Sequence, residues 1–158
     1  MDKDFVPVRV YGVSADPGDG LPLVLLVDEC AGEGVRLQIG PFEASAIIME
    51  LEGIVPPRPL THDLLASLFR ETRTVLQRAE LFGCLDEGPR ARLVYRRGLL
   101  RHRREVRPSD ALALAVRLGA PILAQRTLLE SREKAELGIS ALKPETGHLF
   151  LKTASRTV

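Results

Sequence analysis

The alternation of hydrophobic and polar residues predicts two groups of three β-strands each. These six strands are expected at residues 5–13, 21–27, 34–39, 73–82, 90–96 and 99–106. Segments rich in glycine, proline and acidic residues, such as SADPGDG at 14–20, separate them. The run LPLVLLV at 21–27 is apolar throughout, which is typical of a strand in the interior of a sheet.

Each group of strands is followed by a segment with helical periodicity. We expect helices over 41–51 and 108–118, with Pro41 and Pro108 in the first turn, where proline is tolerated. Gly119 is a plausible stop for the second helix. The apolar stripe of the first helix consists of Ala44, Ile47, Ile48 and Leu51. The equivalent stripe of the second helix consists of Ala111, Leu114, Ala115 and Leu118.

A third helix is expected between the two groups, over residues 60–72, because prolines forbid helix before Leu60. Thr61 is its expected N-cap. A buried face is expected from Leu64, Leu65, Leu68 and Phe69.

After the last repeated helix we expect a short strand at 121–124 and a helix at 126–137. The tail from Gly138 has no clear period and is expected to be loosely ordered.

Residues 40–51 (GPFEASAIIMEL) and 107–118 (RPSDALALAVRL) resemble each other at an offset of 67 positions. The pairs aligned by this offset include Pro41 with Pro108, Glu43 with Asp110, Ala44 with Ala111 and Leu51 with Leu118. The same offset relates the predicted strands, so the sequence predicts an internal duplication of a β-β-β-α unit. Chance agreement over twelve residues is the alternative.

The expected fold is therefore a single α+β domain with mixed or antiparallel sheets and helices packed on them. We place the domain at residues 1–131, with repeats at about 5–53 and 72–120, a connecting helix at about 60–72, and a C-terminal tail at 132–158. The sequence has no run of eighteen apolar residues, so it predicts no membrane span. The first residues lack the apolar core of a signal peptide, and a cytoplasmic location is therefore expected. Cys30 and Cys84 are expected as buried free thiols.

Positive charge is concentrated in one part of the chain. The formal net charge is +1, but residues 88–107 contain eight arginines and the single acid Glu105. This local field favours a polyanion such as DNA or RNA, with Arg101, Arg103 and Arg104 as candidate phosphate ligands, while His102 in the same strand is a further candidate contact. The alternative is a solvated hairpin whose arginines pair with acids elsewhere, because only Tyr95 is available there to stack on bases.

Three segments together resemble a known family. They are IGPFEASAI at 39–47, PPRPLTHDLL at 56–65 and VRPSDALALAVRLGAPI at 106–122. In combination they resemble the bifunctional nuclease domain family over roughly residues 6–131. The resemblance implies a fold of two intertwined strand–strand–strand–helix repeats and an ability to hydrolyse both DNA and RNA.

Phosphodiester hydrolysis needs an activated water, stabilisation of developing negative charge, and help for the leaving oxygen. The candidate catalytic residues in the motifs are Glu43, His62, Asp63 and Asp110. His62 has a side chain suited to proton transfer near neutral pH. Glu43, Asp63 and Asp110 are also candidate ligands for Mg²⁺ or Mn²⁺. The candidate phosphate ligands in the motifs are Arg58, Arg107 and Ser109.

Structural roles are the alternative for these motif residues. Glu43, Asp63 and Asp110 each fall in the first turn of a helix, where a carboxylate favours the helix dipole and caps exposed amides. Arg58 is equally suited to bind a phosphate or a carboxylate such as Glu43 or Asp110. The protein would then be a non-catalytic nucleic-acid-binding or regulatory module, or a subunit of a homo-oligomer. Convergence of Glu43, His62, Asp63 and Asp110 in one open cleft would favour catalysis, and we expect Asp63→Ala then to abolish cleavage without unfolding.

Overall fold

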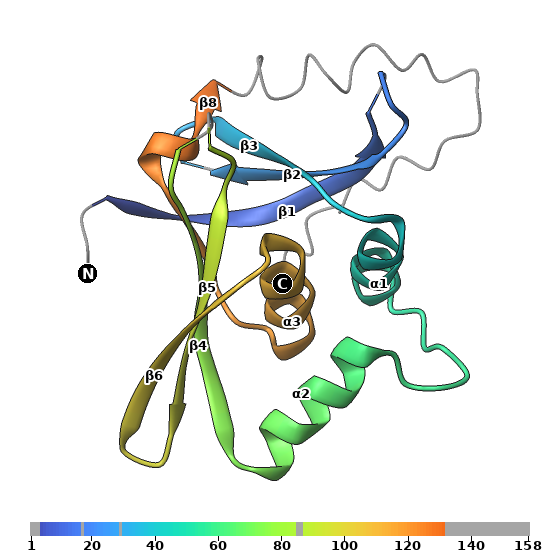
Figure 1. Cartoon of the computed structure of the whole chain (residues 1–158), viewed down its shortest axis with the longest axis vertical. Coiled ribbons are helices and arrows are strands. Elements are labelled where there is room, and N and C mark those ends of the chain that lie inside the picture. The colour runs from blue at the N-terminus through green and yellow to red at the C-terminus, as the bar shows by residue number, and fades with distance from the viewer. Residues whose placement is uncertain (1–3, 17, 29, 85–86, 132–158) are drawn as a thin grey trace.

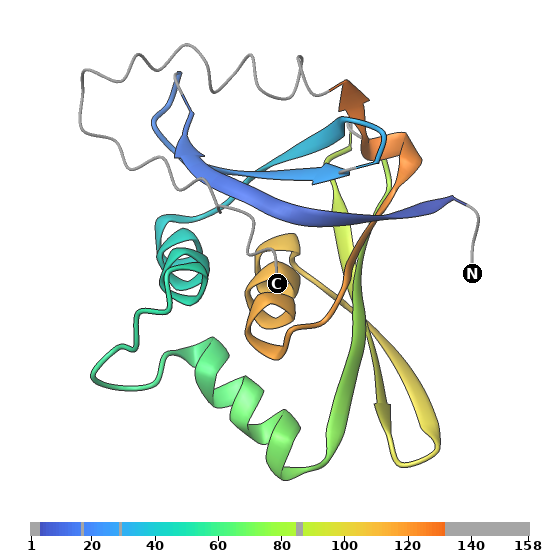
Figure 2. The same cartoon turned by 180° about the vertical axis from the view of Figure 1, so that it is seen from behind.

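The computed structural model describes residues 4–16, 18–28, 30–84 and 87–131, and these form one α+β domain. A strongly curved sheet wraps around the helices, so that the helices lie on its concave side (Figures 1 and 2). The sheet has eight strands in the order β6-β5-β4-β7-β1-β2-β3-β8. None of the described helices is long and apolar enough to cross a membrane.

The elements follow the expected order along the chain. The strands are β1 (Phe5–Ala15), β2 (Pro22–Asp28), β3 (Glu33–Gln38), β4 (Thr74–Phe82), β5 (Arg90–Arg97), β6 (Leu100–Val106), β7 (Ile122–Gln125) and β8 (Glu130–Ser131). The helices are α1 (Pro41–Leu51), α2 (Thr61–Glu71) and α3 (Pro108–Leu118), and a 3₁₀ helix, η1, covers Arg126–Leu128. The six strands and three helices predicted before residue 119 are therefore confirmed, with ends that differ by one or two residues.

Two antiparallel meanders make up most of the sheet, and β7 joins them. In the first meander β2 pairs with β1 and β3, and in the second β5 pairs with β4 and β6. Strand β7 pairs antiparallel with β1 and parallel with β4. The predicted strand at 121–124 is thus confirmed, and it connects the two halves of the chain.

Each half has the succession of three strands and a helix that the sequence predicts. The bounds of α1 and α3 differ by the same 67-residue offset as the sequence motifs. The pairing register shifts in the first strand of each half, between Val10 and Gly12 in β1 and between Leu76 and Arg78 in β4. The internal duplication of a β-β-β-α unit stays a prediction.

The core lies between the concave side of the sheet and helix α3. Five consecutive residues of this helix, Ala111–Ala115, are fully buried. Complete burial of a leucine such as Leu112 or Leu114 contributes about 1.5–3 kcal/mol relative to exposure. Helix α1 packs on α3, and the contact of Arg107 with Glu43 places the beginnings of the two helices side by side.

Helix α2 differs from its prediction. It packs on α3 and β4, but only Ala66 is buried, while Phe69 is partly buried against Tyr95. Leu64, Leu65 and Leu68 are exposed. The expected buried face is therefore wrong for these three leucines, because the helix lies at the rim of the core and only one edge of its apolar stripe reaches the sheet.

The start of α2 also differs from the prediction. Leu60, not Thr61, is the N-cap, and Thr61 is the first helical residue. A side-chain cap from Leu60 is chemically impossible, and instead the Asp63 carboxylate accepts a hydrogen bond from the Leu60 amide at 2.7 Å. The acid at the third helical position therefore supplies the capping that the sequence assigned to Thr61.

Two further predictions are wrong within the described residues. The helix expected at 126–137 is a single 3₁₀ turn followed by β8, because Leu128 enters the core and Glu130 pairs with Gly34 of β3. Residues 132–137 and the rest of the predicted tail, including His148, lie outside the described residues. Cys30 and Cys84 are free, as expected, but both are exposed because they follow the ends of strands rather than lie within them.

Candidate functional site

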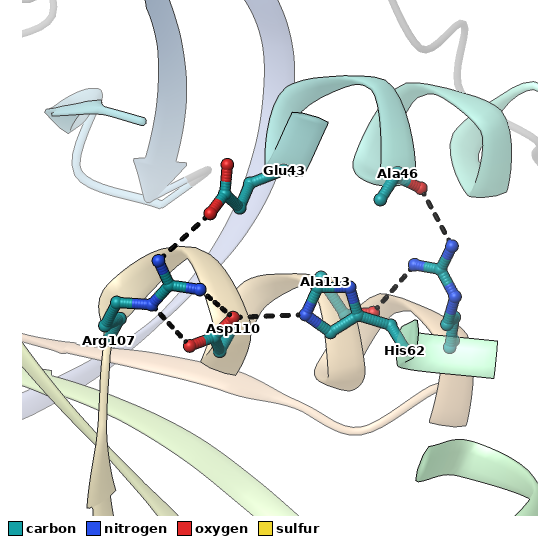
Figure 3. Close-up of polar contacts among 7 residues, drawn as sticks. Glu43, Ala46, His62, Arg107, Asp110 and Ala113 are labelled. Carbon is teal, nitrogen blue, oxygen red and sulfur yellow. Dashed lines mark hydrogen bonds and ion pairs between the residues drawn. The ribbon is translucent and has the colours of Figure 1, made fainter. Parts of the chain in front are cut away.

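The starts of the three helices bring four of the sequence-predicted residues together. Glu43 belongs to the first turn of α1, His62 to that of α2, and Asp110 to that of α3, while Arg107 is the N-cap of α3. Figure 3 shows these side chains pointing toward one another across the space between the helices. Residues more than sixty positions apart thus form one polar network.

Arg107 connects the two equivalent carboxylates. Its Nε and Nη2 donate to Oδ2 and Oδ1 of Asp110 at 2.8 and 3.0 Å, and its Nη1 lies 3.1 Å from Oε1 of Glu43. The contact with Asp110 raises the pKa of the Arg107 guanidinium, with a smaller contribution from Glu43. The side chain remains 67% exposed, and three contacts leave two of its five N–H donors available to a ligand.

Asp110 also contacts the motif histidine. Oδ1 of Asp110 lies 3.2 Å from Nε2 of His62, whose side chain is only 13% exposed. The hydrogen bond from Arg107 lowers the pKa of Asp110, burial raises it, and the contact with His62 lowers it again, so that the net pKa is below the ordinary value. An ionised carboxylate can only accept hydrogen bonds, so neutral His62 carries its proton on Nε2 and its lone pair on Nδ1.

A pocket of about 580 Å³ opens beside this network, between the edge of β3 and the start of α3. Glu43 and Arg107 line it, together with Arg36, Gly40 and Ser109. The Glu43 carboxylate lies against Gly40, since a Cβ atom built on Gly40 would come within 2.3 Å of Oε2. The absence of a side chain at position 40 therefore allows Glu43 to take the orientation in which it meets Arg107.

Asp63 lies in a separate ion pair. Its Oδ1 accepts a hydrogen bond from Nε of Arg117 at 2.6 Å, while its Oδ2 caps the Leu60 amide. Burial raises the pKa of Asp63, but the hydrogen bonds from Arg117 and the Leu60 amide outweigh it, and the net pKa is below the ordinary value. The convergence of Glu43, His62, Asp63 and Asp110 that would favour catalysis is thus only partial, because Asp63 pairs with Arg117 instead.

Arg117 is the important residue that the sequence reasoning missed. Its side chain is 4% exposed, and it donates to the carbonyl oxygens of Ala113 and Ala46 at 3.2 and 3.1 Å as well as to Asp63. It thereby ties α1, α2 and α3 together. The available signal was a single arginine in the otherwise apolar segment ALALAVRL, because a charge inside a core helix needs partners.

The other predicted phosphate ligands lie in different places. Arg58 is exposed and forms no ion pair with another described residue, whereas Ser109 is largely buried at the pocket. Arg101, Arg103 and Arg104 lie on β6 and are exposed, with alternate residues on opposite faces of the sheet. His102 stacks on Tyr95 at a centroid distance of 5.2 Å.

The predicted metal ligands do not form one group. Within residues 4–131, apart from the gaps in the described ranges, no three His, Cys, Asp or Glu side chains are placed to hold a metal ion. Glu43 and Asp110 are held apart by Arg107, and Asp63 is bound to Arg117. The three carboxylates in this arrangement therefore do not fit a shared Mg²⁺ or Mn²⁺ site, and metal binding stays a prediction.

Comparisons with known proteins agree with the motif resemblance. The family model described as the bifunctional nuclease domain matches residues 24–137. Two proteins of Mycobacterium tuberculosis, from strains CDC 1551 / Oshkosh and ATCC 25618 / H37Rv, are each 33% identical over 157 residues and are described as uncharacterized. Each alignment covers 94% of this chain and 94% of the relative. The chain therefore belongs to the bifunctional nuclease domain family.

Proposed function

We propose that this protein is a nuclease that hydrolyses phosphodiester bonds of DNA and RNA with little sequence specificity. The observation that carries this proposal is the network of His62, Asp110, Arg107 and Glu43, of which Glu43 and Arg107 line an open pocket. A histidine held by a carboxylate and an arginine with free donors are two of the groups that phosphodiester hydrolysis needs. Family membership supports a function related to nucleic acids.

In this proposal His62 transfers the proton. Asp110 fixes the imidazole with the proton on Nε2 and stabilises the imidazolium that forms when Nδ1 accepts a proton from water. Arg107 uses its two remaining N–H donors to bind the phosphate, and Glu43 and Asp110 hold the guanidinium in place. Asp63 has no contact with the reacting groups and acts as a structural residue.

The test is cleavage of labelled single- and double-stranded DNA and RNA by the wild type, by His62→Gln and by the matched variant His102→Gln. Each reaction is run with Mg²⁺, with Mn²⁺ and with EDTA. A proton-transfer role predicts that His62→Gln lowers kcat/KM by about 10²- to 10⁴-fold. His102→Gln should retain wild-type cleavage, and both variants should unfold at the wild-type midpoint. Equal cleavage by folded His62→Gln would exclude the proposed role.

A non-catalytic nucleic-acid-binding or regulatory module is the second candidate function. It is favoured by the fact that each motif carboxylate already has an arginine partner: Glu43 and Asp110 share Arg107, and Asp63 binds Arg117. Such pairs fit a role in holding the helices together. The same assay decides between the two, because a module would bind the labelled nucleic acids without cleaving them under any of the three conditions.

A further inference from the structure

The second meander divides its arginines between two faces of the sheet. Residues paired across a ladder share a face, and alternate residues along a strand point to opposite faces. Ala91, Leu93 and Tyr95 of β5 face the helices, since they belong to the core or pack against it. The residues between them in β5, with their ladder partners, therefore point away from the helices.

We call this outward surface the arginine face. Its charged residues are Arg78 and Glu80 of β4, Arg90, Arg92 and Arg96 of β5, and Arg101, Arg103 and Glu105 of β6. The fully buried Val94 lies among them, between Arg78 and Arg103. The ladder pairs place Arg92 between Glu80 and Glu105, and Arg96 beside Arg101. All three helices lie on the other side of these strands (Figures 1 and 2).

Two glutamates neutralise part of the positive charge and fix its position. Glu80 is 3% exposed and binds Arg78 at 2.5 Å and also Arg92. Burial raises the pKa of Glu80, but the hydrogen bonds from Arg92 and Arg78 outweigh it, so the carboxyl group stays ionised. Glu105 holds Arg90 with two hydrogen bonds, of 2.8 and 2.9 Å.

The remaining arginines of this face have no carboxylate partner among the described residues. Arg96 donates to the carbonyl oxygen of Gly98 at 2.6 Å, and Arg101 donates to Oε1 of Gln77 at 2.9 Å. Arg96, Arg101 and Arg103 are all exposed. The six arginines against two glutamates thus leave a surplus of positive charge, concentrated toward the tip of the β5–β6 hairpin.

The chemistry of this face matches a nucleic acid better than an acidic protein. All its cations are arginines, whose planar guanidinium binds phosphate with two donors and stacks on aromatic rings. Arg90 and Arg92 lie over the ring of Phe82, with 5.3 and 5.0 Å from Cζ to the ring centroid. Arginines two residues apart along a strand are roughly 6.5 Å apart, so an extended strand can contact several of them at once.

We propose that the arginine face binds the phosphate backbone of single-stranded nucleic acid. This surface is separate from the network of His62 and Asp110, which lies among the helix starts on the other side of the sheet. The proposal does not depend on nuclease activity, because a binding module and a nuclease would both use such a surface.

The test compares two pairs of arginine substitutions. Arg101→Gln with Arg103→Gln removes two charges from the arginine face, and Arg73→Gln with Arg97→Gln removes two exposed charges that lie outside it. Binding to a fluorescein-labelled 20-nucleotide single-stranded DNA is measured by anisotropy, in EDTA, at several salt concentrations. The arginine-face pair should weaken binding about tenfold or more and reduce the slope of log K against log salt by about 1.4. The control pair should change affinity by less than about twofold.

Three outcomes would overturn the proposal. They are no binding of the oligonucleotide by the wild type, equal weakening by both pairs of substitutions, and competition by poly-glutamate as strong as that by unlabelled single-stranded DNA. A duplex bound more tightly than the single strand would overturn the choice of ligand. His62→Gln should bind the oligonucleotide like the wild type. A variant that loses cleavage but keeps this binding therefore bears on the proposed nuclease site and not on the arginine face.

Discussion

Two arginines of α3 show how the same side chain serves different purposes. Arg107, at the N-cap, is exposed and joins Glu43 to Asp110, whereas Arg117, in the last turn, is buried and joins α1, α2 and α3. Glu43, His62, Asp110 and Arg107 were predicted because they belong to the motif segments that carry the family resemblance. Arg117 was not, because its importance comes from its contacts with Ala46 of α1 and Asp63 of α2, which no local pattern reveals.

Gly40→Ala tests the orientation of Glu43. The new Cβ atom would overlap Oε2 of Glu43, and since this oxygen ends a flexible side chain, the carboxylate is expected to swing away rather than the backbone to shift. Arg107 would then lose one of its two acidic partners. We expect an unchanged unfolding midpoint and a changed cleavage rate. Gly53→Ala is not a suitable control, because Gly53 has a φ of 66° and an alanine there would add backbone strain.

A suitable control for Gly40→Ala is Ser45→Ala in the same helix, whose hydroxyl group donates to the carbonyl oxygen of Pro41 within the same helix. It should leave both stability and cleavage nearly unchanged. A lower unfolding midpoint for Gly40→Ala than for this control would show that the backbone, not the Glu43 side chain, absorbs the overlap.

Asp63→Asn should lower the free energy of unfolding and make it less dependent on pH between about 3 and 7. The pKa of Asp63 is lowered in the folded state, so its stabilisation is present above the unfolded pKa of about 3.9 and is lost as the pH falls through the folded value. Removing the charge leaves buried Arg117 without its closest acid, which should cost about 1.5–3 kcal/mol at pH 7. Urea unfolding between pH 3 and 7 measures both effects.

Glu52→Gln, which removes one exposed carboxylate at the end of α1, is the matched control for this charge change. If Asp63→Asn has the same free energy of unfolding as Glu52→Gln at pH 7, the ion pair with Arg117 does not support the fold. The earlier expectation that Asp63→Ala would abolish cleavage without unfolding is replaced, because any loss of activity in that variant would include a loss of stability.

At the scale of elements, periodicity predicts the helices and strands well but not how deeply each is buried. Alternating and continuous apolar runs predict the strands of both meanders to within two residues, because alternation follows from the pleat and a continuous apolar run from burial on both faces. The stripe on α2 was equally clear, yet Leu64 is 57% exposed. Burial depends on what lies opposite a stripe, and the position of α2 at the rim follows from long-range packing.

Ala113→Leu and Leu68→Ala should have unequal effects on stability, although both change one apolar side chain on a helix. Ala113 is fully buried where α3 meets its neighbours, so added methylene groups should cost about 1–3 kcal/mol. Leu68 is 46% exposed, and its truncation should cost less than about 1 kcal/mol. Chemical unfolding of both variants checks this, and a larger loss for Leu68→Ala would indicate that α2 is covered in solution.

At the scale of the whole molecule, β7 holds the two meanders in one sheet. It pairs with β1 on one side and with β4 on the other, and Ala124 is fully buried between them. The sequence predicted this strand from four residues, PILA, but not its neighbours, because a parallel pairing with β4 depends on the path of α3 between them. The position of α3 also sets where its first turn, with Arg107 and Asp110, meets the starts of α1 and α2 at the candidate site.

Hydrogen exchange should follow this arrangement. Amides of β7 and of the adjoining parts of β1 and β4 are expected to exchange only through global unfolding, because opening them separates the two halves of the sheet. Amides of β6, which is an edge strand, should exchange faster through local opening. Exchange followed by mass spectrometry measures both, and equal protection of β6 and β7 would mean that the edge is covered.

The central place of β7 has a consequence for synthesis on the ribosome. Strand β1 is made near the beginning of the chain, but its partner β7 begins only at Ile122. Until that segment leaves the exit tunnel, the nascent chain has unpaired edges at both β1 and β4, which are the kind of edges that pair with other chains. The growing polypeptide is therefore most exposed to misassociation just before its seventh strand emerges, when a chaperone that shields strand edges would matter most.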